Sequence, residues 1–349
     1  MIINRDSLVK SLNYLSMAVS KTIVSKNSEK LLLLESKGDT VYGYTCDSIN
    51  NIRVEIGKST DDFYALVEFA SFFSSIKSCE GDITLETKGK FIQIKASNVK
   101  CKLPTYNHEV KRDATGIPDP TNNYTYTNKL TDKIELGILK TIIDPNHPVE
   151  IYKKIYFGDY IVVSDTDNVL RINKKIFTED IILNVSSVEI LNNLSNIEYT
   201  YINDNGIRKL AVKSDELYAV FVITENTNND YQYTDFIDLF NSVAGSNIII
   251  DSTVLAKAMS AAAMFKTTPK IVFNPKGVFL QIDNVEFIYK ISDKSCEDHI
   301  YELPADLVKK ITVIGKDITL YYTNDDLLRC DCGNIHEILS AKELKTNES

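Results

Sequence analysis

The stretch FYALVEFASFFSSIKSCEGDITLETKGKFIQIKASNVKCKL, residues 63–103, decides the fold of this chain. It opens with a short apolar segment. Phe69, Phe72, Phe73 and Ile76 then recur at helical spacing, which is typical of a helix with one buried face. Three segments of alternating apolar and polar residues follow. The stretch therefore predicts a strand, an amphipathic helix and three strands in succession.

The same succession returns about every fifty residues, and a fixed period is the sequence signature of repeated structural units. In the first repeat, Leu8, Leu12 and Leu15 form the apolar stripe of the helix. In the third repeat, the segment KIELGILKTIID (133–144) occupies the position of the helix. The sequence contains six such repeats, which begin at Met1, Phe63, Lys133, Asp180, Asn247 and His299.

The repeats group into three pairs, and each pair predicts one domain. The segment 113–128 contains Gly116, Pro118 and Pro120 among several Asn, so it is interpreted as a linker. The polar segment 226–236 is interpreted as the second connection. We expect domain 1 at 1–112, domain 2 at 129–235, and domain 3 with a C-terminal arm at 236–349. Consecutive strands joined by short turns imply antiparallel sheets with helices on one face, hence an α+β fold.

Composition supports a globular protein with real cores. The chain has 349 residues, of which 44% are hydrophobic and 25% are charged, and Gly and Pro are scarce. No apolar run is long enough to span a bilayer, and the N-terminus lacks the pattern of a signal peptide. The six cysteines show no framework spacing, which favours free thiols in a reducing cytoplasm.

The order and pattern of these segments resemble those of the bacterial β sliding clamp, the dimeric processivity factor of the replicative DNA polymerase. The resemblance extends over about residues 1–345, and three segments carry most of it: Thr45-Cys46-Asp47, Glu68–Ile76 and Thr253–Phe265. It implies three clamp-like domains, each a pseudo-twofold pair of β-α-β-β-β units. Two such chains would close head to tail into a ring, with strands paired across every junction.

The resemblance also implies surfaces for assembly and for partners. It places Met264 and Phe265 at the dimer junction, facing an edge strand that carries Cys101 and Leu103. Short linear motifs of polymerases and clamp-loader subunits would insert between domains 2 and 3, at a pocket formed by Tyr152, Leu170, Val243 and Leu339. The four pocket residues, and likewise Met264 and Phe265, could instead belong to ordinary cores.

Two segments depart from the family pattern at that pocket. Ser164–Arg171 stands where the family has Thr-Asp-Gly-His-Arg-Leu, so that only Leu170 matches plainly, and His336–Leu344 replaces the usual Met-Pro-Met-Arg-Leu ending. The identity of the bound peptide is therefore open. The divergence, with the bias toward Asn, Ile and Lys, would suit a phage-encoded clamp acting in a host cytoplasm.

The chain carries a net charge of −9, which must be reconciled with DNA binding. Residues 1–112 have a positive balance and the rest a negative one. Lysines that lie off the apolar stripes of the helices, ordinary solvated side chains taken singly, would together point into the hole of a ring. The expected contacts are to the backbone of duplex DNA without sequence preference, from Lys10, Lys21, Lys77, Lys140, Lys257, Lys266, Lys309 and Lys310.

No motif indicates catalysis, and we expect no enzymatic activity, no metal and no cofactor. The helix of the fourth repeat, with Glu189, Asn192 and Asn193, supplies no positive charge. Cys330 and Cys332 with His336 form a poor ligand set for zinc. One alternative is a clamp-like ring that recruits transcription or repair factors. A less favoured one is a divalent-metal nuclease using Asp165 and Asp167, which a solvated hairpin turn explains better.

Overall fold

A computed structural model shows the protein as two compact units. The first comprises Met1–Lys133 and Ser186–Thr224, and the second comprises Ile134–Val185 and Glu225–Ser349. The structure describes residues 1–20, 26–106, 115–121, 124–145, 147–165, 168–225, 233–243, 245–265, 269–282, 285–302, 317–322 and 327–340. Each unit is described by itself.

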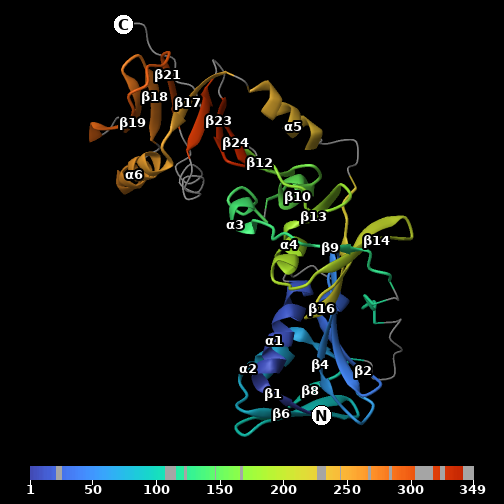
Figure 1. Ribbon diagram of the computed structural model, residues 1–349. Coiled ribbons are helices and arrows are strands. Elements are labelled where there is room, and N and C mark those ends of the chain that lie inside the picture. The colour runs from blue at the N-terminus through green and yellow to red at the C-terminus, as the bar shows by residue number, and fades with distance from the viewer. Residues whose placement is uncertain are drawn as a thin grey trace. The chain divides into compact units, whose positions relative to one another are not determined.

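The first compact unit contains two antiparallel sheets (Figure 1). The four-stranded sheet has the order β1 (Ile2–Asn4), β6 (Asp82–Lys88), β7 (Phe91–Lys95), β8 (Lys100–Pro104). The eight-stranded sheet has the order β5 (Tyr64–Glu68), β2 (Leu31–Lys37), β3 (Thr40–Cys46), β4 (Asn50–Lys58), β16 (Leu217–Val222), β15 (Ile207–Lys213), β14 (Glu198–Asp204), β9 (Asn128–Lys129).

The second compact unit is built in the same way. Its eight-stranded sheet has the order β13 (Ile181–Asn184), β10 (Lys154–Phe157), β11 (Ile161–Ser164), β12 (Asn168–Ile172), β24 (Ile335–Ser340), β23 (Leu327–Cys332), β22 (Ile318–Tyr322), β17 (Ser246–Ile250). Its four-stranded sheet has the order β20 (Phe287–Ser292), β19 (Gly277–Ile282), β18 (Lys270–Asn274), β21 (His299–Glu302).

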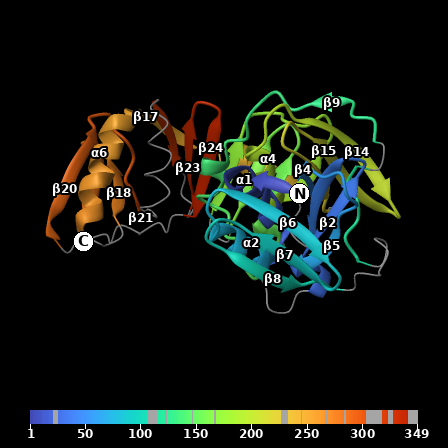
Figure 2. The ribbon, with the colours of Figure 1, turned by 90° about the horizontal axis from the view of Figure 1, so that it is seen from below.

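Three helices follow the predicted stripes. In α1 (Arg5–Leu15), Leu8, Leu12 and Leu15 are fully buried, and the Asn4 side chain caps the helix by accepting from the amides of Asp6 and Ser7. The helix α2 (Phe69–Lys77) packs beside α1 (Figure 1). The helix α6 (Ser252–Ala262) packs on β19 and β20 and is capped by Asp251 (Figure 2).

The helix expected over 133–144 is wrong in extent, because only α3 (Leu136–Leu139) is helical. Its N-cap residue, Glu135, makes no side-chain cap hydrogen bond. Gly137 weakens a helix entropically, and the β-branched run Thr141-Ile142-Ile143 disfavours its extension. The helix of the fourth repeat forms as α4 (Val185–Asn192). That of the sixth lies outside the described residues.

A further helix, α5 (Tyr233–Ser242), begins inside the segment interpreted as a polar connection. The connection at 226–236 is therefore wrong for its last residues. Phe236 and Phe240, spaced one helical turn apart, are buried, and Val243 after them is buried as well. This spacing was the sequence pattern that could have revealed the helix.

Strand exchange confirms the predicted pairing of repeats. The first strand of repeat one, β1, pairs with β6 of repeat two, and β5 of repeat two pairs with β2 of repeat one. In repeats three and four, β13 pairs with β10, and β14 pairs with β9. The strand β9 lies before Lys133, so repeat three begins a few residues earlier than expected. The same exchange joins repeats five and six through β17–β22 and β21–β18. Each pair is thus a pseudo-twofold unit, and the fold is α+β as predicted.

Candidate DNA-binding, partner-binding and assembly surfaces

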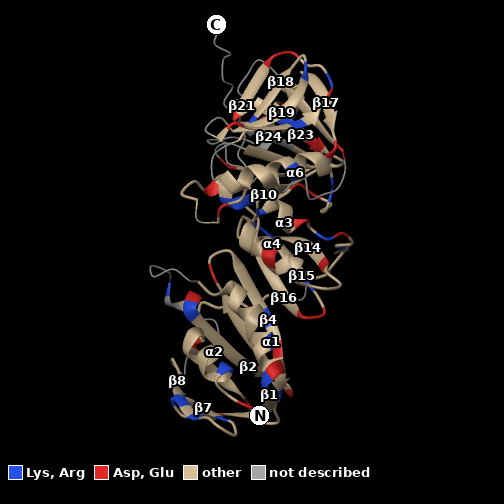
Figure 3. Ribbon diagram, turned by 90° about the vertical axis from the view of Figure 1, so that its left-hand side faces the viewer, with Lys and Arg blue, Asp and Glu red and all other residues tan. Residues whose placement is uncertain are grey.

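Four of the eight predicted DNA-binding lysines lie on or directly after described helices. Lys10 lies on the exposed side of α1, and Lys77 ends α2 with its Nζ 4.0 Å from the centroid of the Phe73 ring. Lys140 follows α3, and Lys257 lies on α6; all four are exposed. Figure 3 colours Lys and Arg blue and Asp and Glu red along the ribbon. The other four, Lys21, Lys266, Lys309 and Lys310, lie outside the described residues.

An apolar cluster forms where α5 covers the eight-stranded sheet of the second compact unit. Phe236, Phe240 and Val243 pack on Val162 and Val169 of the sheet, together with Ile182. Partly buried Ile151, Tyr156, Tyr160, Ile237, Leu239 and Leu327 surround this cluster. We call the whole group the α5 patch. Of the four predicted pocket residues, it contains Val243.

The other predicted pocket residues lie elsewhere. Leu170 is 1% exposed and alternates with Val169, so it faces the opposite side of the sheet. Tyr152 is half-buried and makes an edge contact with His147, with ring centroids 4.8 Å apart. Leu339 is opposite Asn168 in the strand register, but its side chain is outside the described part. The structure therefore does not bring Leu170 and Val243 together.

A buried charged cluster lies beside the α5 patch, and sequence reasoning missed it. The Arg171 guanidinium carbon is 4.6 Å from the Phe240 ring centroid. Arg329 binds Asp331 through two hydrogen bonds of 2.8 and 2.7 Å and donates to the Phe240 carbonyl. His336 Nδ1 lies 2.8 Å from Asp331 Oδ1. Asp331 and His336 lie opposite each other in one hairpin of repeat six, and the pairing of β12 with β24 brings Arg171 of repeat three beside them.

Electrostatics follows from this burial. Burial, together with the neighbouring Arg329, lowers the pKa of Arg171. Burial alone would raise the pKa of Asp331, but hydrogen bonds from His336 and Arg329 outweigh it and hold that pKa below its usual range. The single carboxylate is thus ionised at neutral pH and is shared by Arg329 and His336.

Both four-stranded sheets end in an edge strand that no described strand covers. In the edge strand β8, half-buried Cys101 and Leu103 alternate with exposed Lys100 and Lys102. The edge strand of the other sheet is β20, where Ile288 is 65% exposed. Met264, 74% exposed, and Phe265 follow α6, and the Phe265 ring lies 5.3 Å from that of Phe287 on β20. The predicted interface residues therefore gather beside these two edges.

The alternative chemistry finds no assembled site in the described part of the chain. Asp165 Oδ1 accepts from the Asn168 amide at 2.7 Å, which is a hairpin-turn contact, and Asp167 is outside the described residues. Cys330 and Cys332 are buried on the sheet face opposite His336. Among the described residues, no three His, Cys, Asp or Glu side chains group as a metal site. No described helix is long and apolar enough to cross a membrane.

Paired-repeat domains joined by shared eight-stranded sheets define the class of DNA-clamp folds, and the chain has the fold of bacterial β clamps. No protein-family model matches the sequence. No curated protein matches it.

The chain is similar in fold to several solved structures. The chain is similar to the DNA polymerase sliding clamp from Caulobacter crescentus, with a TM-score of 0.77, 13% identity, and coverage of 98% of this chain and 99% of that one. For the Helicobacter pylori β clamp bound to a DNA ligase peptide, the TM-score is 0.76 and the identity 13%, over 98% of this chain and 99% of that one. For the β chain of DNA polymerase III from Streptococcus pneumoniae, the TM-score is 0.73 and the identity 12%, over 99% of both chains.

Proposed function

We propose that this protein is a DNA sliding clamp, a ring of two chains that encircles duplex DNA and tethers a polymerase to it. The observation that carries the proposal is the way in which the six repeats use their last strands. The last strand of repeat one, β4, pairs with β16 of repeat four. The last strand of repeat three, β12, pairs with β24 of repeat six. Of the six last strands, β8 of repeat two and β20 of repeat five are the two that pair with only one described strand.

A second copy of the chain supports closure of both edges. If β8 of one chain paired with β20 of another, the joined sheet would read β1-β6-β7-β8-β20-β19-β18-β21. Both eight-stranded sheets within the chain have this same order of strand types. Two such junctions would close a head-to-tail homodimer. Exposed Met264 and Phe265 would be covered at the junction, and pairing would remove two edges that otherwise invite aggregation.

DNA would be held by topology and weakly by charge. Lys10, Lys77, Lys140 and Lys257 are exposed on or beside helices whose other faces are buried. Contacts from such lysines would go to phosphates, which carry no sequence information and allow the ring to slide. The net charge of −9 does not oppose this arrangement, because the potential inside the hole depends on local charge.

Partner proteins would bind the second compact unit through short linear motifs. Support comes from the α5 patch, whose half-buried aromatic and aliphatic side chains Ile151, Tyr160 and Leu327 form a rim around a buried floor. Apolar anchors of an extended peptide suit such a surface. A DNA polymerase and a clamp loader are the expected partners, and the similar Helicobacter pylori clamp binds a DNA ligase peptide.

The proposal assigns the protein no chemistry of its own, no metal and no cofactor. It would act in the cytoplasm of a bacterium or of a phage-infected host. A retention assay tests the function directly. Protein loaded onto nicked circular DNA on beads should remain at salt concentrations that screen the lysines, and should be released when the circle is linearised. Equal retention on circular and linear DNA would exclude a topological ring.

A further inference from the structure

One hairpin turn occurs twice in the chain with the same hydrogen bonds. Between β3 and β4, the Asp47 amide donates to the Asn50 carbonyl at 2.9 Å, and Asp47 Oδ1 accepts from the Asn50 amide at 2.6 Å. Between β11 and β12, the corresponding distances for Asp165 and Asn168 are 3.0 and 2.7 Å. Both turns lead into a strand that pairs across two domains, β4 with β16 and β12 with β24. The two turns therefore mark equivalent positions of the repeat.

The residues after these turns also correspond. Val169 follows the second turn, lies opposite Ile338 and belongs to the α5 patch. Asn51 follows the first turn and lies opposite Val220. The position of the first compact unit that corresponds to the proposed partner surface is thus the surroundings of Asn51 and Val220.

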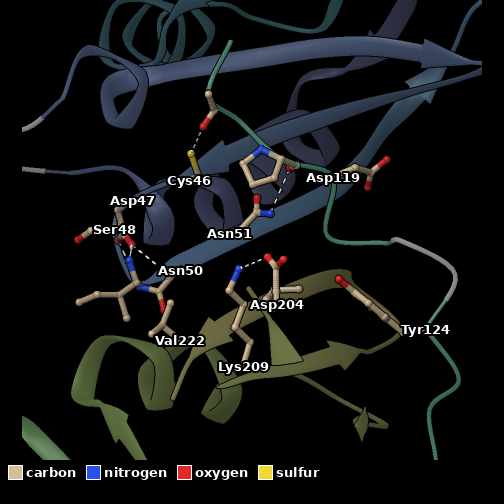
Figure 4. Close-up of a pocket in the computed structure, with 14 residues that line it drawn as sticks. Cys46, Asp47, Ser48, Asn50, Asn51, Asp119, Tyr124, Asp204, Lys209 and Val222 are labelled. Carbon is tan, nitrogen blue, oxygen red and sulfur yellow. Dashed lines mark hydrogen bonds and ion pairs between the residues drawn. The ribbon is translucent and has the colours of Figure 1, made fainter. Parts of the chain in front are cut away.

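A cavity of about 250 Å³ occupies this position (Figure 4). One wall is the turn at Cys46–Asn51, and the opposite walls are formed by β14, β15, β16 and the segment around Pro118. That segment is held in place, because Asn51 Nδ2 donates to the Pro118 carbonyl at 3.1 Å and Arg53 donates to Thr121 at 2.7 Å. The space is smaller than the roughly 300–1,000 Å³ of pockets for whole small molecules. It suits one or two side chains.

The lining of this cavity is acidic. Asp47, Asp119 and Asp204 contribute three carboxylates, and Lys209 contributes the one basic group among the lining residues. Asp119 is already paired with Lys37 and lies 3.7 Å from Arg53, so Asp47 and Asp204 supply most of the negative charge. Lys209 Nζ binds Asp204 at 2.6 Å, yet the Asp204 side chain remains 53% exposed. Figure 4 shows the Asp204 carboxylate and the Tyr124 hydroxyl facing the same space. A cation entering here would meet carboxylate and aromatic groups together.

A buried acceptor in the same cavity lacks a donor. Asn51 is 9% exposed, and no described group donates to its Oδ1. In Figure 4 the Asp204 carboxylate points across the cavity toward the side that carries the Asn51 amide. Because an unpaired buried acceptor is costly, a ligand with N–H donors is favoured over one with acceptors only. Burial raises the pKa of the Cys46 thiol to about 12, with Asp47 adding to the effect, so this thiol is protonated and suited to packing.

We propose that this cavity is a second docking site, which binds a lysine or arginine side chain from an extended segment of a partner protein. Charge complementarity, the side-chain-sized volume and the unpaired Asn51 acceptor define the occupant. The kind of occupant rests on the proposed partner surface at the equivalent position, whereas the site itself lies wholly within the first compact unit and does not require ring closure.

Methyl NMR of the full-length protein tests the site with defined probes. Methyl groups of Ile49, Val220 and Val222 line the cavity and would report binding. The probe is the blocked tripeptide acetyl-Ala-Arg-Ala-amide, and the control has norleucine in place of arginine. We expect saturable shifts of these three residues at millimolar arginine peptide and none with the norleucine peptide. Absence of saturable shifts, shifts spread over the whole acidic surface, or equal shifts with both peptides would overturn the proposal.

Two variants change the cavity charge in opposite directions. Asp204→Asn should weaken binding of the arginine peptide by about tenfold, the scale of one charged hydrogen bond. Lys209→Met should strengthen it, because Asp204 loses its internal partner. Asp61→Asn removes an exposed carboxylate outside the cavity and should leave binding unchanged. Equal affinities of all three variants would refute the site even if the protein still forms a ring. A failed ring with these responses intact would refute only the clamp function.

Discussion

The proposed ring depends most directly on pairing of β8 of one chain with β20 of the other. In the double variant Met264→Asp, Phe265→Asp, two exposed apolar side chains beside β20 become charged. The chain itself should tolerate this, because Met264 is 74% and Phe265 36% exposed. Fully burying such a side chain contributes about 1.5–3 kcal/mol, so covering the exposed parts of both contributes about 2–3 kcal/mol. An unpaired charge in the apolar contact costs about 2 kcal/mol more.

The expected loss per junction is therefore about 4–5 kcal/mol, or roughly three orders of magnitude in the dissociation constant. Mass photometry and sedimentation velocity should show a dimer for the wild type and a folded monomer for the variant. The matched control is Ile249→Asp, which charges a 61% exposed side chain on β17 and should leave the dimer intact. A variant that still sediments as a dimer would show that β20 and the end of α6 are not the junction.

Three further predictions concern DNA, partners and stability. Replacing the helix lysines Lys10, Lys77 and Lys257 by Glu should impair loading onto circular DNA in the bead assay and preserve the dimer. As a control, replacing Lys88 and Lys90 in a hairpin by Glu should change the loading little. Val243→Asp should weaken binding of a polymerase-derived peptide at least tenfold by fluorescence anisotropy, since it charges a buried position of the α5 patch, while unchanged affinity would move the peptide site elsewhere. Asp331→Asn should lower the free energy of unfolding by roughly 3 kcal/mol at neutral pH, because Arg329 loses a buried partner. The folded-state pKa of Asp331 is lowered, so the stability that its carboxylate contributes is complete above the ordinary pKa of about 4 and is lost as pH falls below that value. In urea titrations the difference in unfolding free energy between wild type and variant should therefore become smaller at low pH. A difference that does not change with pH would contradict this explanation.

The C-terminal strand limits how the partner surface can be tested by truncation. Residues up to Ser340 belong to β24, which pairs with β12 on one side and β23 on the other. Deletion from residue 338 would remove half of this central strand and damage the sheet. A deletion from residue 341 leaves the strand whole and tests the arm alone.

Local periodicity explains which elements were predictable. The stripes of Leu8, Leu12 and Leu15, and of Phe69, Phe72 and Ile76, identify α1 and α2 because a helix displays its buried face every three to four residues. Where the pattern was mixed, prediction failed. The helix around Gly137 is only four residues long instead of the twelve expected. The helical spacing of Phe236 and Phe240 was not recognised because polar residues precede it.

Site residues were harder to predict, since their neighbours come from distant repeats. Leu170 and Val169 are adjacent in sequence, yet strand alternation sends them to opposite faces. Only the described fold shows that Val169 accompanies Val243. Likewise, Arg171, Arg329 and His336 meet because β12 pairs with β24 and β24 with β23. Arg329 and His336 belong to one hairpin, but neither charge nor spacing in the sequence marks Arg171 as their neighbour.

By itself, the sequence determined the six repeats, the helices with a clear apolar stripe, and the grouping into three pairs, because hydrophobic periodicity acts over a few residues and survives divergence to 13% identity. Tertiary structure alone decided which strands exchange within a pair, which last strands join across domains, and which two last strands have only one described neighbour. Backbone hydrogen bonds make those choices, and every residue but proline carries the same donor and acceptor. Their pairing over more than a hundred residues, as between Asn51 and Val220, therefore leaves no local mark in the chain.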